Sequence, residues 1–207
     1  AVKPQSAFYE MYGLYGEELM HRTIRYAKEK GLYIILDVKR NDIGSTAQAY
    51  SKAYLGKVDI DGEEISPCDV DCITVNPYLG SDGVMPFVED CKKFDKAIFA
   101  LVKTSNPSSG ELQDLISGEK HIYEYAAECV NKWNEDTIGE SGYGAVGAVV
   151  GATYPEQAKV LRKLMPKSYF LVPGYGAQGG GAKDVVPCFN QDGLGAVVNS
   201  SRGIMCA

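Results

Sequence analysis

Short apolar runs alternate with amphipathic segments along the chain, and this alternation limits the possible folds more than any other feature of the sequence. The runs are rich in β-branched residues and nearly continuous in hydrophobicity, which is typical of parallel strands covered on both faces. Seven of them are candidate strands: AVKPQ, LYIILDV, CITVNPYL, AIFALVKTS, AVGAVVGATY, YFLVPGYG and GAVVNSS. The sequence therefore predicts a parallel sheet built from strand–helix units.

Two of the segments between these runs carry clear helix signals. Residues 16–30 place Glu17 and Glu18 in a predicted first turn, and the pattern ends at Gly31. The second segment, Pro155–Leu164, begins with the proline that favours a first helical position, and a further proline follows its end. Helices of this kind are the crossovers that parallel strands require.

Repeated strand–helix units form either an open doubly wound sheet or a closed barrel. The early strands are not followed by the G-x-G-x-x-G turn of dinucleotide-binding sheets. Because the chain opens on an apolar run without methionine and stops just after another, we expect a further strand in front and a helix behind. With that strand the count is eight, and we predict a (β/α)8 TIM barrel that here lacks its first strand and last helix. We expect residues 1–207 to form a single domain with a helical insertion at about residues 107–144.

Charge and cysteine content narrow the class of partner. The net charge of −6 provides no basic footprint for nucleic acid or an anionic membrane. The six cysteines include no C-x-x-C pair, and the sequence shows neither a signal-peptide pattern nor a stretch of roughly 20 apolar residues. We therefore expect a cytoplasmic protein with reduced thiols and a small-molecule ligand.

The stretch ILDVKRNDIGST crowds charged residues onto the end of a buried strand. Side chains two apart in a strand project to the same side, so Asp37 and Lys39 should enter the barrel together near its C-terminal rim, where active sites lie. Asp42 adds a third charge, and Lys3 lies at the same level of the first visible strand. A purely structural ion pair is the alternative, but burial costs on the order of several kcal/mol per ion, so we favour a catalytic cluster.

The last two candidate strands end in segments suited to an anion. Glycines in VPGYGAQGGG allow backbone N–H groups to approach a phosphate, and barrels often bind phosphate with the loops after strands seven and eight. Arg202 supplies a planar guanidinium group that can donate two hydrogen bonds to phosphate oxygens. Gln178 lies in the flexible glycine-rich loop, from which it can close over the same phosphate. Ser105, in an SNP turn, can hydrogen-bond a polar ring edge, although such a turn needs no ligand to explain it.

Other kinds of site find little support in the sequence. His21 and His121 fall in predicted helices, and no spacing of cysteine, histidine or carboxylate residues indicates a metal site. The glycine-rich loop lacks the lysine and Ser/Thr of a P-loop, and nothing suggests a serine nucleophile with a histidine base.

These motifs resemble those of the orotidine 5′-phosphate decarboxylase family. LDVKRNDIGST matches the family signature D-x-K-x-x-D-I-x-x-T, and AVKPQ, TVNPYLG, LVKTSNP, VVGATYP, VPGYGAQGG and VNSSRGI look like the bacterial branch. The D-x-K-x-x-D core occurs in the wider superfamily, but its combination with the SNP turn and GAQGG loop is specific. The resemblance implies a homodimeric barrel that converts orotidine 5′-monophosphate to uridine 5′-monophosphate, the last step of de novo UMP synthesis, without metal or organic cofactor.

The resemblance also implies roles for individual residues. An alternating charge network, with Lys39 as the general acid, would consist of Lys3, Asp37, Lys39 and Asp42. Asp42 and Thr46 are expected to reach the partner subunit's active site, with Thr46 near the ribose hydroxyls. Ser105 would face the pyrimidine, and the phosphate would be held by Gln178, Arg202 and the backbone of Gly203. The family's L-D-P segment, whose Asp binds ribose, precedes the point where this sequence begins.

Three other interpretations stay open. A magnesium-dependent sugar-phosphate decarboxylase or synthase of the same superfamily would lose activity with a chelator. An aldolase would use Lys39 as a Schiff-base nucleophile. A non-catalytic phospho-ligand-binding barrel would bind the nucleotide without turning it over.

Overall fold

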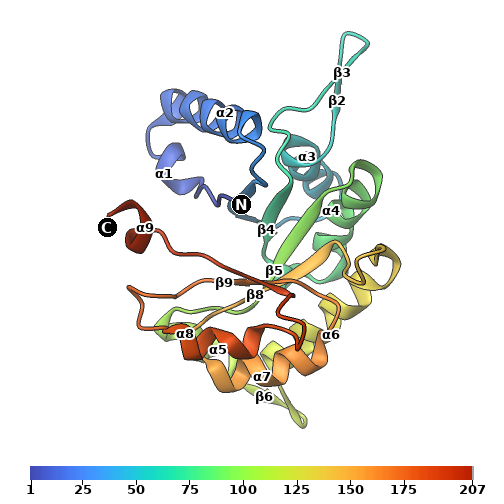
Figure 1. Ribbon diagram of the computed structural model, residues 1–207. Helices are drawn as coiled ribbons and strands as arrows, with labels where there is room; N and C mark the ends of the chain where they lie inside the picture. The colour runs from blue at the N-terminus through green and yellow to red at the C-terminus, as the bar shows by residue number, and fades with distance from the viewer. Residues whose placement is uncertain (207) are drawn as a thin grey trace. The chain divides into compact units, whose positions relative to one another are not determined.

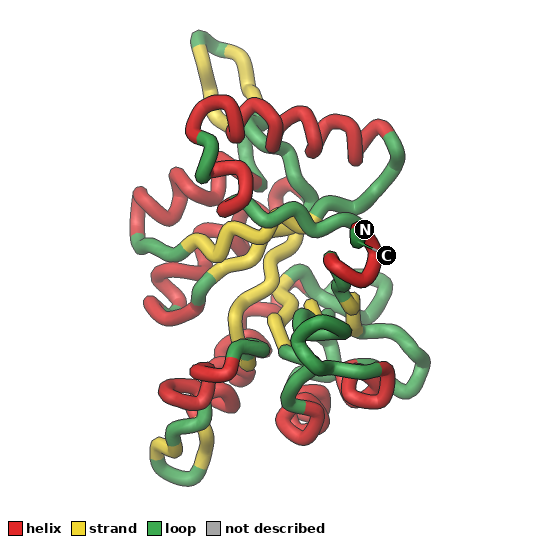
Figure 2. Tube along the Cα trace, turned by 90° about the vertical axis from the view of Figure 1, so that its left-hand side faces the viewer, coloured by secondary structure: helices red, strands yellow, loops and turns green. Residues whose placement is uncertain are grey.

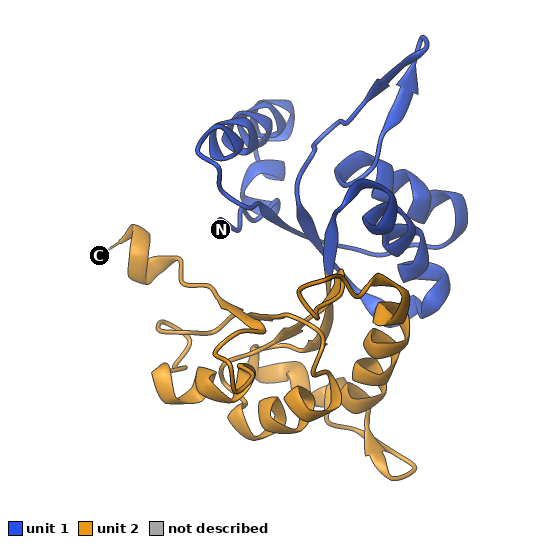
Figure 3. Ribbon diagram, turned by 45° about the vertical axis from the view of Figure 1, so that its right-hand side comes forward, with its two compact units in different colours: residues 1–98 blue, residues 99–207 orange. Residues whose placement is uncertain are grey.

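The structure is a computed structural model that describes residues 1–206. It divides into two compact units, Ala1–Ile98 and Phe99–Ala207, which Figure 3 colours separately. The main sheet has the strand order β1-β4-β5-β8-β9-β10, and the division between the units falls within β5 (Ala97–Lys103). Each neighbour in this order is the next main strand along the chain, as in a (β/α)8 barrel. The single domain expected from the sequence stays a prediction.

Unit 1 contains β1 and β4 with their helices and one separate hairpin (Figure 1). Its elements before β5 are α1 (Ala7–Glu10), α2 (Gly13–Glu29), β1 (Ile35–Arg40), α3 (Gly44–Tyr54), β2 (Val58–Ile60), β3 (Glu63–Ile65), β4 (Cys72–Val75), η1 (Pro77–Leu79) and α4 (Ser81–Phe94). All four residues of β4 and the first four of β1 are buried, so both faces of these strands are covered.

The N-terminal run AVKPQ lies along β1 but does not form a regular strand. Isolated parallel bridges join Val2 to Ile34 and Gln5 to Asp37. Pro4 cannot donate a backbone hydrogen bond, yet its carbonyl accepts from the Asp37 N–H at 2.9 Å. The predicted strand is therefore an extended segment that holds Lys3 beside the end of β1.

The first long helix begins earlier than the sequence pattern predicts. The helix α2 starts at Gly13, so Glu17 and Glu18 are not in its first turn, and that part of the prediction is wrong. Gly16 packs against α1: an added Cβ would lie 1.8 Å from the carbonyl oxygen of Tyr9. The glycine therefore serves close packing of the two helices and does not mark a helix start.

Unit 2 contains β8, β9 and β10 and the segment predicted as an insertion. Its elements after β5 are η2 (Pro107–Ser109), α5 (Gly110–Gln113), β6 (Ile116–Ser117), β7 (Lys120–His121), α6 (Ile122–Asn134), η3 (Glu135–Thr137), β8 (Val146–Val150), α7 (Pro155–Leu164), β9 (Phe170–Val172), α8 (Ala182–Val185), η4 (Val186–Cys188), β10 (Ala196–Val198) and α9 (Arg202–Met205). The bounds of α7 confirm the predicted helix, and α6 lies where a helix is expected within residues 107–144.

Two antiparallel hairpins lie outside the predicted pattern. Strands β2 and β3 pair in unit 1, and β6 and β7 pair in unit 2; Figure 2 shows each as two short strands joined by a tight loop. The first turns at Asp61 and Gly62, whose φ angles of 54° and 86° are those of a two-residue hairpin loop. No helix within residues 1–206 has the length and apolar character needed to cross a membrane.

A buried arginine joins several segments of unit 2. The guanidinium of Arg162, on α7, donates to the carbonyls of Cys188 at 3.1 Å, Gly195 at 3.0 Å and Ser168 at 2.6 Å, and also to Met165 O. It stacks 3.8 Å from the ring centroid of Phe170. Burial removes the Arg162 guanidinium from water and lowers its pKa to about 10, and within residues 1–206 no carboxylate forms an ion pair with it.

Candidate functional site

The carboxylate of Asp37 lies between two lysine ammonium groups at the end of β1. Lys3 Nζ is 2.8 Å from Asp37 Oδ2, and Lys39 Nζ is 2.6 Å from Asp37 Oδ1. The side chains of Asp37 and Lys3 are 9% and 16% exposed, whereas that of Lys39 is 47% exposed. Lys39 is therefore the member of this group that a ligand can most readily reach.

The surroundings of Asp37 favour its ionised form. Burial alone would raise the pKa of this carboxyl, but Lys3 and then Lys39 outweigh burial through charge and hydrogen bonding, so the pKa lies below its ordinary value. A fixed negative charge consequently lies in contact with the partly exposed Lys39 ammonium group. Such an arrangement can hold a proton donor in place and stabilise its charged form.

Thr74 on β4 completes this cluster, and the sequence analysis does not identify it. Its hydroxyl donates to Asp37 Oδ1 at 2.8 Å and accepts from the Lys39 N–H at 2.9 Å. The residue is buried, and it fixes both the carboxylate and the lysine backbone. We refer to Lys3, Asp37, Lys39 and Thr74 as the Asp37 cluster.

Strand β1 is bulged where it carries these residues. Leu36 pairs with Ile73 and Arg40 with Val75, so β1 has more residues than β4 over this interval. Lys39 has a φ of 48°, a left-handed conformation that is uncommon for a residue with a side chain and costs on the order of 1 kcal/mol or more. The regular alternation assumed from the sequence is therefore wrong here, although the lysine amine still meets the carboxylate.

Asp42 and Thr46 follow the Asp37 cluster in the chain. Asp42 Oδ1 accepts from the Ile43 N–H at 2.8 Å, and in the described part of the chain it forms no ion pair with Lys39. Thr46 lies exposed in the first turn of α3. Their expected place in a partner subunit's active site stays a prediction.

In unit 2, Ser105 and Gln178 contact each other. Ser105 Oγ donates to Gln178 Oε1 at 2.8 Å. Two glycines leave room for the serine: a Cβ on Gly151 would lie 2.8 Å from the Cα, Cβ and N atoms of Ser105, and one on Gly174 would lie 3.1 Å from its Cβ. The structure thus brings together two residues that the sequence analysis assigns to different parts of a ligand.

Gln178 also lines an open cavity of about 280 Å³ at the start of α7. The other lining residues are Ala152, Thr153, Pro155, Gly179, Gly180 and Asp184. The N-terminus of α7 provides a positive dipole end, which favours an anion, whereas the Asp184 carboxylate accepts from the Gly181 N–H at 2.7 Å. A larger open cavity of about 490 Å³, lined by residues 141–143, 166 and 190–192, includes none of the predicted site residues.

The glycine-rich loop differs in detail from the predicted phosphate cradle. The N–H groups of Gly176, Gly179 and Gly180 donate to carbonyls of the same loop at 2.7, 2.8 and 3.1 Å. These amides are therefore occupied in this structure. Arg202 and Gly203 belong to α9 and are not among the residues that line the 280 Å³ cavity. The shared phosphate-binding role expected for Gln178, Arg202 and Gly203 stays a prediction.

Cysteine and histidine side chains take no part in these sites. Residues 1–206 contain no group of three or more His, Cys, Asp or Glu side chains arranged to hold a metal ion. The cysteines are free thiols, and burial raises the pKa of Cys68 to about 11. The prediction that the protein needs no metal rests on the resemblance and stays a prediction.

Comparison with known proteins gives a consistent result over the whole chain. The sequence model of the orotidine 5′-phosphate decarboxylase / HUMPS family matches residues 1–207. Proteins named orotidine 5′-phosphate decarboxylase from Caldicellulosiruptor bescii and Rhodopirellula baltica are 50% and 54% identical to it over 206 residues. These alignments cover 100% of this chain and 68% and 67% of the respective relatives, so the chain spans about two thirds of their length.

Solved structures agree with this result. The Leishmania donovani OMP decarboxylase superposes with a TM-score of 0.81 at 36% identity, covering 100% of this chain and 73% of that one. The Leishmania donovani UMP synthase gives a TM-score of 0.86 at 39% identity, covering 100% of this chain and 42% of the longer protein. These neighbours and the strand order confirm the predicted (β/α)8 fold class.

Proposed function

The chain belongs to the orotidine 5′-phosphate decarboxylase / HUMPS family, and on that premise we propose that it converts orotidine 5′-monophosphate to uridine 5′-monophosphate and CO₂. The observation that carries the proposal is the contact of Lys3 and Lys39 with the buried carboxylate of Asp37. The relatives named for this activity support the same assignment.

The chemical difficulty of this reaction lies at C6 of the pyrimidine. When the C6–CO₂ bond breaks, its electron pair remains in an sp² orbital that the ring carbonyls cannot delocalise. A cation that is already fixed next to C6 stabilises this negative charge, because no groups have to rearrange during the reaction. Such electrostatic stabilisation of the transition state is the largest part of the rate enhancement in many enzymes. The partly exposed Lys39 ammonium group, held by Asp37 Oδ1 at 2.6 Å, is suited to this role.

Lys39 would then act as the general acid. Its ammonium group gives a proton to C6, so an N–H bond breaks and a C–H bond forms. Asp37 holds the lysine amine in place before this step, and Lys3 contacts the carboxylate from its other side. Repulsion between Asp37 and the substrate carboxylate would add ground-state stress, which is a secondary contribution.

The remaining site residues would bind and orient the nucleotide. Ser105 would face the pyrimidine, and the phosphate would be held by Gln178, Arg202 and Gly203. Phosphate binding far from C6 supplies energy that positions the ring, so its loss should lower turnover as well as affinity. In a homodimer, Asp42 and Thr46 would enter the partner's site. The homodimer and a cytoplasmic location stay predictions.

The Lys39→Ala variant tests this proposal directly. Alanine removes the amine while keeping a non-glycine residue at the left-handed position, so the backbone strain is nearly unchanged. We expect turnover, followed by the ultraviolet absorbance of the pyrimidine, to fall by at least about 10³-fold, or about 4 kcal/mol, with nucleotide binding still measurable. The control is Lys159→Ala, an exposed lysine on α7 that should leave turnover unchanged.

Four outcomes would contradict the proposal, and the last three would each support one of the alternatives. Retained decarboxylation in the Lys39→Ala variant would reject the assignment. Loss of wild-type activity with a chelator would favour the magnesium-dependent synthase, and a borohydride-trapped adduct on Lys39 would favour an aldolase. Nucleotide binding without any turnover by the wild type would favour a binding protein.

A further inference from the structure

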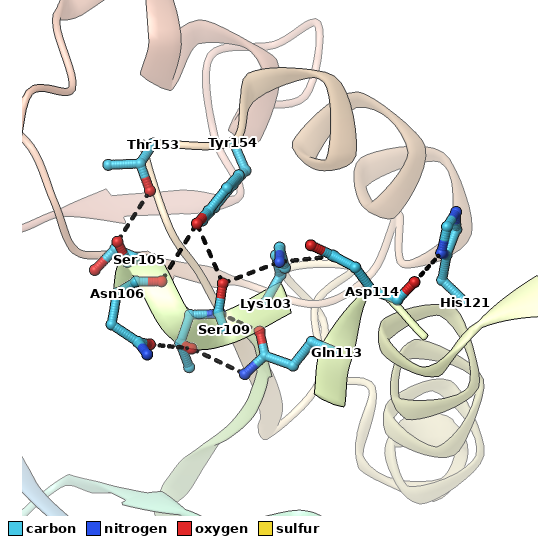
Figure 4. Close-up of polar contacts among 10 residues, drawn as sticks. Lys103, Ser105, Asn106, Ser109, Gln113, Asp114, His121, Thr153 and Tyr154 are labelled. Atoms are coloured by element: carbon cyan, nitrogen blue, oxygen red, sulfur yellow. Dashed lines mark hydrogen bonds and ion pairs between the residues drawn. The ribbon is translucent and has the colours of Figure 1, made fainter. Parts of the chain in front are cut away.

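Lys103, the last residue of β5, is a fully buried lysine with three partners in unit 2. Its Nζ lies 2.7 Å from Asp114 Oδ1 as an ion pair, donates to Ser109 Oγ at 3.0 Å and lies 4.2 Å from the ring centroid of Tyr154 (Figure 4). The Lys103 side chain is 0% exposed, whereas that of Asp114 is 37% exposed. The partners belong to separate segments, namely η2, the end of α5 and the start of α7.

Stability alone does not explain a charge at this position. Lysine is rarely fully buried, and replacing a buried ion pair by packed apolar residues is often neutral or stabilising. An apolar side chain of similar length would fill the same space at the end of β5. The ammonium group therefore points to a role in arranging the polar groups around it.

The groups around Lys103 form a directed chain of hydrogen bonds. Ser109 Oγ accepts from the Lys103 ammonium and donates to Tyr154 Oη at 3.3 Å, and Tyr154 Oη donates to the carbonyl of Asn106 at 3.3 Å. An ammonium group can only donate and a carbonyl can only accept, so both hydroxyls are oriented in one direction. The charge at one end polarises the whole chain and strengthens it.

This chain ends beside Ser105. Tyr154 Oη donates to the carbonyl of Asn106, and Thr153 Oγ1 donates to the carbonyl of Ser105 at 3.2 Å (Figure 4). Two neighbouring residues just before α7 therefore hold two neighbouring carbonyls of the turn. The backbone of Ser105 sets the direction of its hydroxyl, which donates to Gln178. A change at Lys103 would therefore reach a predicted site residue through the backbone.

We propose that Lys103 is a positioning residue for the decarboxylation reaction and acts through Ser105. The inference rests on the proposed function, because it assumes that the Ser105 hydroxyl contacts the pyrimidine. The Lys103 ammonium group holds the SNP turn on the start of α7, and the turn presents Ser105 to the ligand. Lys103 itself does not touch the substrate.

A double-mutant cycle separates this role from a general structural one. We expect Lys103→Met to lower kcat/KM by about 10–100-fold, the loss typical of a misplaced binding group. In the Ser105→Ala background the same change should lower kcat/KM by less than about threefold, because the group through which Lys103 acts is already missing. Lys159→Met, at an exposed lysine, is the matched control and should leave kcat/KM unchanged.

The cycle overturns the proposal in two cases. A Lys103→Met variant within twofold of the wild type would show that the charge does not position Ser105. An equal loss in both backgrounds would show that Lys103 acts through the fold in general. If Lys103→Met fails to fold, the pair Lys103→Met with Asp114→Asn removes both charges and takes its place in the cycle.

A substrate-free measurement distinguishes failure of this inference from failure of the proposed function. Hydrogen exchange at the backbone N–H groups of residues 104–106, 108 and 109 should become at least about tenfold faster in Lys103→Met, while the amides of β8 keep their wild-type rates. Unchanged exchange in the turn would overturn the positioning role. An inactive wild type would refute the proposed function alone, and the exchange rates would still decide whether Lys103 holds the turn.

Discussion

Replacing Gly151 by alanine tests whether the position of Ser105 matters for turnover. The added Cβ would lie 2.8 Å from three atoms of Ser105, two of them backbone atoms, whereas ordinary contacts begin near 3.4 Å. The SNP turn must therefore move by about 0.6 Å, and the hydrogen bond from Ser105 to Gln178, now 2.8 Å, would stretch to about 3.4 Å, the outer limit for such a bond.

The expected effect on catalysis follows from that displacement. A misplacement of this size should lower kcat/KM by about 10–100-fold, which corresponds to about 1.4–2.7 kcal/mol. Overpacking should also lower the free energy of unfolding by about 1–3 kcal/mol. Steady-state decarboxylation and urea unfolding of the same preparation measure the two effects separately.

The matched control is Gly139→Ala. Its added Cβ would meet no heavy atom closer than Tyr143 O at 3.9 Å, and Gly139 does not have a positive φ, so both activity and stability should stay near wild type. Wild-type kcat/KM in Gly151→Ala, together with a loss of stability, would refute the reasoning, because the turn would then have moved without consequence for the reaction.

Two further predictions concern buried charges. The pKa of Asp37 is lower in the folded protein than its ordinary value of 3.8, so its carboxylate stabilises the fold above about pH 4, and this contribution is lost as pH falls through the folded pKa. In the Asp37→Asn variant, the free energy of unfolding should therefore decline less steeply below pH 4 than in the wild type. An unchanged decline would contradict this prediction. Arg162→Met should lower the unfolding free energy by about 3–5 kcal/mol in urea, because its carbonyl acceptors lose their donor, with Arg162→Lys intermediate. A methionine variant as stable as the wild type would mean that desolvation of the guanidinium cancels its hydrogen bonds.

The parts of the fold that the sequence predicts are those with local signals. The helix α7 has the predicted bounds because Pro155 favours the first helical position, and because Pro166 disfavours a helical backbone at the residue before it. The hairpin of β2 and β3 also has a local signal, the Asp61–Gly62 pair between short strands. Its strands are largely exposed, so the pattern of buried apolar runs does not indicate it.

The parts that the sequence does not predict depend on distant partners. The bulge at Lys39 arises from the register between β1 and β4, and Thr74 joins the cluster only because of that register. Lys103 looks like an ordinary strand end in the sequence. Its amine contacts the ring of Tyr154, which lies 51 positions further along the chain.

The left-handed backbone of Lys39 has a consequence for protein design. The position of its amine beside Asp37 depends on the left-handed backbone at this residue as well as on the identity of the side chain. Grafting Lys3, Asp37 and Lys39 onto flat, regular strands would reproduce these three residue types but not the arrangement of their side chains in this structure. The extra residues of β1, together with a threonine on the adjacent strand, have to be transplanted as one unit.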